Sequence, residues 1–96
     1  MIVVRDVFQT KYGKSSDLVS LLKESQEKWP AQYATRILTD ASGPFFTVVA
    51  ETEFERLAAW EQVSSQYFTF PDFSDWFERM TLLVESGRRE FFNIET

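Results

Sequence analysis

The order of strand-like and helix-like segments constrains the fold of this chain more than any other feature. Runs rich in branched and aromatic residues, which favour strands, lie at 2–9, 33–39, 45–52 and 88–95. One helical repeat separates the first two runs, and a longer helical region separates the last two. At 96 residues, the chain is expected to form a single domain over 1–96.

Turn residues mark the ends of the segments in the first half of the chain. The first helix is predicted to begin at Ser15 or Ser16, either of which can cap it, and to end before Pro30. The sequence DASGP at 40–44 is a turn cluster, so the second and third strand-like runs are predicted to form a hairpin with a five-residue loop.

The second crossover contains a break. A helix is predicted to start at about 53–55, and the sequence YFTFPDF at 67–73 interrupts the helical pattern at Pro71. A further helix is predicted to begin at about Asp72, with Gly87 as its C-terminal stop.

This β-α-β-β-α-(α)-β order predicts an α+β fold of the ferredoxin-like plait type. Right-handed crossovers give a four-stranded antiparallel sheet in the order 4-1-3-2 with helices on one face. The third run places Phe46 and Val48 on one side and Phe45 and Val49 on the other, so both faces of the sheet are apolar. Two apolar faces need two covers, and we expect a homodimer in which two such sheets pack face to face.

Composition limits the chemistry. The chain has no Cys and no His, which excludes disulfides, thiolate ligands and a histidine base. The net charge of −5 disfavours nucleic acid as a partner. No apolar run reaches the roughly 18 residues of a membrane span, and no signal-peptide pattern is visible, so we expect a cytoplasmic protein without a membrane partner. With no glycine-rich phosphate loop and no carboxylate cluster, we expect no cofactor and no metal.

Charged residues stand within the predicted strands. Arg5 and Asp6 are adjacent and therefore point to opposite faces, and from a central strand either can reach the third and fourth strands. One interpretation is a polar patch in a cavity, where Arg5, Arg36 or Asn93 holds an anionic or enolate oxygen. The other, which we favour, is a structural ion-pair network that sets the register of sheet and dimer. Glu51 is a buried base in the first interpretation and a favourable charge near a helix N-terminus in the second.

Aromatic residues form 17% of the chain and suggest either a core or the lining for a flat ligand. Helically spaced rings are usually core, whereas the irregular YFTFPDF segment suits the lid or mouth of a cavity. Arg88 and Arg89 open the last strand and could attract an anion, but a short basic pair at the start of a strand is usually a surface feature, which is the interpretation we favour. The candidate ligand-binding residues are Arg5, Arg36, Glu51, Trp60, Tyr67, Phe70 and Asn93.

The stretches FQTKYGK and ILTDASGPFFTVVAETEFERLAAWE, with a helix between them, resemble the dimeric α/β barrel superfamily and are most similar to its NIPSNAP-like proteins. The resemblance covers about Val4–Glu61 and the last strand. It implies a homodimer whose two sheets form a barrel, with a cavity able to hold a small organic molecule. Members of the superfamily include cofactor-free monooxygenases, isomerases, haem-degrading enzymes and ligand-binding domains. The haem-linked and histidine-dependent functions need side chains that this chain lacks.

Two functions from different classes are therefore expected. The first is a small homodimeric barrel protein of unknown function that binds an apolar or aromatic molecule in a cavity. The second is a cofactor-free monooxygenase or isomerase acting on a phenol or enol-type substrate. A third possibility is a purely assembling subunit whose barrel is filled. An open cavity lined by rings and one unpaired arginine favours a ligand, whereas Arg5 and Arg36 paired inside a filled interior argues against one.

Overall fold

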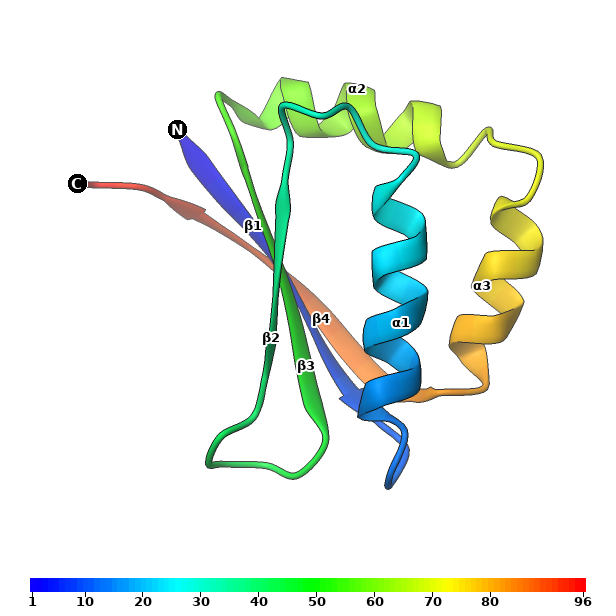
Figure 1. Ribbon diagram of the computed structural model, residues 1–96. Coiled ribbons are helices and arrows are strands. Elements are labelled where there is room, and N and C mark those ends of the chain that lie inside the picture. The colour runs from blue at the N-terminus through cyan, green and yellow to red at the C-terminus, as the bar shows by residue number, and fades with distance from the viewer.

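A four-stranded antiparallel sheet with three helices on one face makes up the computed structural model, which describes residues 1–96 (Figure 1). The strands lie in the order β2-β3-β1-β4, so the predicted 4-1-3-2 order is confirmed. Figure 1 shows α1 and α3 side by side, with α2 running across their ends. The elements in chain order are β1 (Ile2–Thr10), α1 (Ser15–Gln26), β2 (Thr35–Thr39), β3 (Thr47–Phe54), α2 (Leu57–Tyr67), α3 (Phe73–Thr81) and β4 (Val84–Asn93).

The central strand β1 gives the sheet two different faces. It pairs with β3 on one side and β4 on the other, and its side chains alternate between the faces. Val4 packs with Phe54 and Val63 beneath the helices, so the even-numbered residues of β1 face the helices. Asp6 therefore faces the helices and Arg5 faces away from them, so the prediction that the two side chains point to opposite faces is confirmed.

The core under the helices is thin. Only 13 of 96 residues are buried. Four of them form a hydrophobic cluster around Leu18, Leu21 and Val48, and three form a second one around Val4 and Phe54. Helix α3 contributes no buried residue. A chain this short can bury only a modest share of its surface, so much of the aromatic surface stays partly exposed.

The β2–β3 hairpin loop is longer than predicted. Strand β3 begins at Thr47 rather than at residue 45, and Phe46 takes a positive φ of 59°. The Asp40 carboxylate accepts a hydrogen bond from the Thr47 backbone N–H at 3.0 Å, which closes the loop over 40–46. Strand β3 also continues to Phe54, so α2 starts at Leu57 and not at the predicted 53–55.

The predicted serine cap of α1 is wrong. Lys14 precedes the helix and makes no capping hydrogen bond through its side chain, while the Ser15 hydroxyl lies 3.4 Å from that of Thr10. The helix also ends at Gln26, ahead of the predicted end at Pro30, because the chain turns through hydrogen bonds from Lys28 and Trp29.

Gly87 does not stop α3. The helix ends at Thr81, and β4 begins at Val84, four residues before the predicted start of the last strand. Gly87 lies within β4, where a Cβ would come 3.1 Å from the Val7 carbonyl oxygen. None of the three helices is both long and apolar enough to cross a membrane.

Candidate functional site

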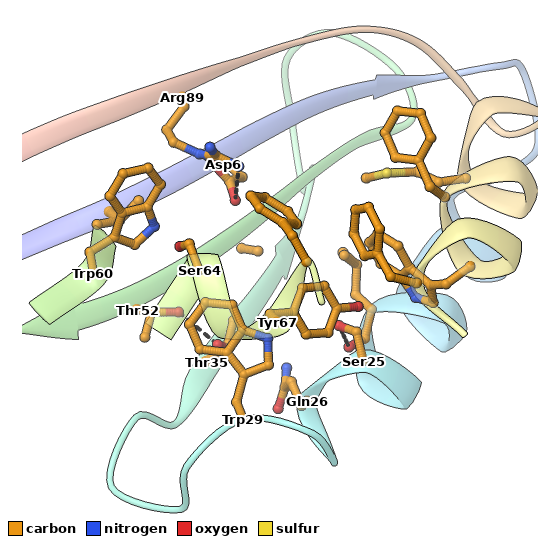
Figure 2. Close-up of a pocket in the computed structure, with 18 of the residues that line it drawn as sticks. Asp6, Ser25, Gln26, Trp29, Thr35, Thr52, Trp60, Ser64, Tyr67 and Arg89 are labelled. Atoms are coloured by element: carbon orange, nitrogen blue, oxygen red, sulfur yellow. Dashed lines mark hydrogen bonds and ion pairs between the residues drawn. The ribbon is translucent and has the colours of Figure 1, made fainter. Parts of the chain in front are cut away.

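A cavity of about 300 Å³ lies between the sheet and the helices (Figure 2). Thirteen of its 20 lining residues are hydrophobic, so it is a mainly apolar space. Strands provide its floor through Val4, Phe8 and Ala50. Ala50 faces Asp6 across β1 and Ile37 across β2, and its short side chain leaves room above the centre of the sheet.

One end of the cavity carries an ion pair between adjacent strands. Asp6 on β1 lies opposite Arg89 on β4, and Arg89 Nε donates to Asp6 Oδ1 at 2.6 Å. The Arg89 guanidinium lies 5.1 Å from the centre of the Trp60 ring, which Phe91 supports edge-on at 5.0 Å. Asp6 and Arg89 are the only charged residues that line the cavity, and Figure 2 shows them side by side on the sheet.

Tyr67, at the end of α2, is the centre of the aromatic wall. Its ring lies within 5.9 Å of the rings of Trp29, Phe73 and Trp76, measured between centroids. Burial raises the pKa of the Tyr67 phenol, and the polar Ser25 hydroxyl partly opposes that rise. The phenol therefore stays protonated at neutral pH and can act as a hydrogen-bond donor.

Helix α3 closes the cavity on one side. Phe73, Trp76, Phe77 and Met80 all line the space, although none of them is fully buried. Trp76 Nε1 donates to the Leu21 carbonyl oxygen at 3.0 Å, which attaches the inner side of α3 to α1.

Two ion pairs attach the α3 region to the outer side of α1. Arg79 makes two hydrogen bonds of 2.9 Å to the Glu24 carboxylate, and Lys28 pairs with Asp72. The hydrogen bond from Arg79 lowers the pKa of Glu24, and the one from Lys28 lowers the pKa of Asp72.

The charged strand residues singled out from the sequence lie on the other face of the sheet. Arg36 Nη2 is 2.7 Å from Glu51 Oε1, and Arg5 Nε is 2.8 Å from Glu51 Oε2. The buried Arg5 Nε is close to that oxygen without donating a hydrogen bond to it. Arg5 also approaches Glu90 at 3.8 Å, and Arg88 pairs with Glu90 at 2.9 Å. Each of these arginines is paired, which fits the structural interpretation.

The cavity brings together only part of the predicted site. Trp60 and Tyr67 line it. Phe70 lies outside it, with its ring centroid 6.0 Å from that of Tyr67, and is 38% exposed. Asn93 lies opposite Ile2 at the end of the sheet and is exposed. Arg5, Arg36 and Glu51 face away from the cavity.

Residue patterns did not indicate that Arg89 lines the cavity. The prediction that Asp6 reaches a neighbouring strand is confirmed, and its partner Arg89 is exposed, as predicted for a surface residue, while it also lines the cavity. The available signal was the alternation along the last strand, which puts Arg89 and Phe91 on one face. No group of three or more carboxylates is placed to hold a metal ion.

No protein-family model matches this sequence, and a search of curated proteins finds no match. Solved structures do match. An uncharacterized NIPSNAP domain protein from Burkholderia xenovorans has a TM-score of 0.84 at 14% identity, covering 98% of this chain and 94% of that one. A NIPSNAP family protein of unknown function from Agrobacterium tumefaciens has a TM-score of 0.82 at 14% identity, covering 96% and 86%.

A third similar structure is that of an oxygenase. The cofactor-independent oxygenase of Streptomyces nogalater has a TM-score of 0.70 at 11% identity, covering 99% of this chain and 93% of that one. At such identities the likeness establishes the fold alone. The predicted resemblance is thus confirmed at the level of the fold: the chain has the ferredoxin-like architecture of the NIPSNAP family proteins.

Proposed function

We propose that this protein binds a small, flat, largely apolar molecule in the cavity between the sheet and the helices. The observation that carries the proposal is a ring-lined space with a single ion pair, Asp6–Arg89, at one end. Ligand sites commonly combine an apolar lining with a few polar groups that orient the ligand. The rings supply contact area for a planar molecule, and the ion pair supplies the charged contacts. Uncharged polar groups also line the cavity, on Ser25, Gln26, Thr35, Thr52 and Ser64.

The size of the cavity restricts the ligand. Small-molecule pockets span roughly 300–1,000 Å³, and this one, at about 300 Å³, is at the lower limit. We therefore infer a ligand of one or two fused rings with one polar edge. Trp29, Trp60 and Trp76, the only tryptophans in the chain, all line the space, so their indole N–H signals report on its contents.

A cavity-filling substitution tests the proposal. Ala50→Leu adds bulk to the floor without changing any polar group, so it should weaken binding of 2-methylnaphthalene at least about tenfold, since it removes space the rings need. Adding 2-methylnaphthalene stepwise and following the three tryptophan indole N–H signals measures the affinity. Val49→Leu, one residue away on the opposite face, is the matched control and should bind like the wild type. Equal binding by both variants would contradict the proposed site.

A second candidate function is cofactor-free oxidation or isomerisation of a phenol or enol. The fold is shared with a cofactor-independent oxygenase, and Asp6 is the one carboxylate that lines the cavity and can accept a proton. Oxidation of a phenol to a quinone would consume one O₂, place one of its oxygen atoms on the ring and release the other as water. Isomerisation would need only proton transfer. Oxygen uptake with 1,5-dihydroxynaphthalene tests the oxidation, and its absence in the wild type would rule that reaction out for this phenol.

We further propose that the protein is a cytoplasmic homodimer. The support for a second copy is the open face of the sheet, which carries a row of paired charges flanked by apolar residues such as Val49. That face is opposite the cavity, so the dimer leaves the ligand site within each copy.

A further inference from the structure

We propose that the Asp6–Arg89 pair makes the cavity select an uncharged ligand, with a donor and an acceptor on the same edge, over a carboxylate of the same shape. This inference rests on the proposed function, because it specifies the polar edge of the ligand that the cavity would take. A planar carboxamide is the simplest group with the required edge.

Two contacts hold the Arg89 side chain in position, one with Asp6 and one with the Trp60 ring. Its Nε donates to Asp6 at 2.6 Å, and its guanidinium lies over the Trp60 ring at 5.1 Å. Nη2 reaches the second oxygen of Asp6 at 3.5 Å, whereas Nη1 makes no hydrogen bond within the protein. The guanidinium therefore keeps free N–H donors beside a carboxylate that keeps free lone pairs.

These two groups present complementary hydrogen bonds in one place. A carboxamide can accept from Arg89 through its oxygen and donate to Asp6 through its nitrogen. Both partners remain charged and paired with each other, so no charge in the site loses its partner. An uncharged ligand edge thus adds hydrogen bonds without disturbing the ion pair.

A carboxylate fits the same place less well. The pair is neutral overall, and no other cation lines the cavity. A ligand carboxylate would share Arg89 with Asp6 and bring a second negative charge next to the first, which disfavours the charged form of both. Discrimination here depends on a repulsive group, Asp6, as much as on the attractive one.

The opposite outcome has a clear physical meaning. If Asp6 only orients Arg89 by its hydrogen bond and does not repel an anion, a carboxylate binds through the free Nη1 side at least as tightly as the amide. The affinities of two matched probes separate these cases, because 2-naphthamide and 2-naphthoate differ only in the group that meets Asp6 and Arg89.

The experiment measures dissociation constants by calorimetry at pH 7 for 2-naphthamide, 2-naphthoate and 2-methylnaphthalene. Wild-type protein should bind the amide about tenfold more tightly than the carboxylate, equivalent to about 1.4 kcal/mol. Asp6→Asn should reverse the order, because it leaves the positive charge of Arg89 without a counter-charge. Glu61→Gln removes an exposed carboxylate that does not line the cavity and should keep the wild-type order.

The outcomes distinguish this inference from the proposal beneath it. Wild-type protein that binds 2-naphthoate as tightly as 2-naphthamide overturns the selection, whatever the Asp6→Asn variant does. An unchanged order in a folded Asp6→Asn variant overturns the role of Asp6. In both cases the cavity still stands as a binding site if 2-methylnaphthalene binds. If none of the three probes binds, the proposed function fails for this ligand class and the inference fails with it.

Discussion

Two neighbouring residues, Arg5 and Asp6, separate the two polar regions of this molecule. Because side chains alternate along a strand, Asp6 reaches the cavity while Arg5 joins the ion pairs on the open face. Asp6 pairs with Arg89 on one neighbouring strand, and Arg5 pairs with Glu51 on the other. One dipeptide in the central strand thus belongs to both the candidate site and the open face.

The role of Asp6 in the second candidate function can be tested at this scale. If Asp6 takes a proton from a bound phenol, Asp6→Asn should lower the rate of oxygen uptake about 10²-fold or more, a usual contribution of a positioned base. Glu61→Gln, which changes the net charge equally at an exposed position, should leave the rate unchanged. A wild-type rate in the Asp6→Asn variant would contradict a catalytic role for this carboxylate.

At the scale of elements, α3 is the least securely held wall of the cavity. It buries no residue fully and depends on the Trp76 hydrogen bond and on the pairs that Glu24 and Asp72 form with Arg79 and Lys28. Elements with few buried contacts open most readily. We therefore expect a ligand to enter the cavity beside α3.

Acid should loosen α3 before the rest of the fold. The pKa values of Glu24 and Asp72 are lowered in the folded protein. Their ion pairs therefore hold α3 against α1 in full above the ordinary pKa values of 4.5 and 3.8, and this contribution is lost as pH falls through the lowered values. Below about pH 4.5, the Trp76 indole signal should shift while those of Trp29 and Trp60 still report a native cavity.

Arg79→Gln should produce part of this loosening already at pH 7, seen as a few-fold faster amide exchange in α3. The effect is small because these pairs are exposed to solvent. Lys23→Gln is the control, because Lys23 lies in the last turn of α1, as Arg79 does in the last turn of α3, but makes no ion pair. In the acid titration, simultaneous shifts of the indole signals of all three tryptophans would show that α3 does not open separately.

The elements themselves were largely predictable from the sequence, since each depends on a local pattern. The strand order and the opposite directions of Arg5 and Asp6 follow from segment order and from alternation. The start of β3 did not follow, because Phe45 and Phe46 have strand propensity, while the Asp40 side chain draws them into the loop.

The candidate site was less predictable because its polar contacts join distant positions. Trp60 and Tyr67 could be proposed from residue type and spacing alone. The Asp6–Arg89 pair joins residues 83 positions apart and needs the register between β1 and β4, which no local pattern specifies. The same holds for Glu24 and Arg79, which are 55 positions apart.

At the scale of the whole molecule, the open face of the sheet has a charge pattern that suits a second copy. Arg36, Glu51, Arg5 and Glu90 follow one another across β2, β3, β1 and β4, so the sign alternates from edge to edge. A two-fold axis parallel to the strands, midway between β3 and β1, places every arginine over a glutamate of the other copy. The apolar residues around this row are Val3, Val7, Leu38, Val49 and Phe92.

The dimer prediction follows from this pattern. Sedimentation equilibrium at micromolar concentration should give twice the chain mass of 11.3 kDa. Glu51→Arg places like charges over one another and should shift the protein toward monomer, whereas Glu27→Arg, at the C-cap of α1 and away from the sheet, should not. A wild-type monomer under these conditions would contradict the proposed dimer.

Because Asp6 lies in the cavity and Arg5 lies on the open face, the sequence of β1 is restricted in how it can change over evolution. Point substitutions alter one face at a time, so the cavity and the open face can diverge independently. A one-residue insertion or deletion in this strand would instead exchange the two faces, directing Arg5 into the cavity and Asp6 toward the open face. Variation in β1 is therefore expected to consist of substitutions at constant length, with length changes confined to its flanking turns.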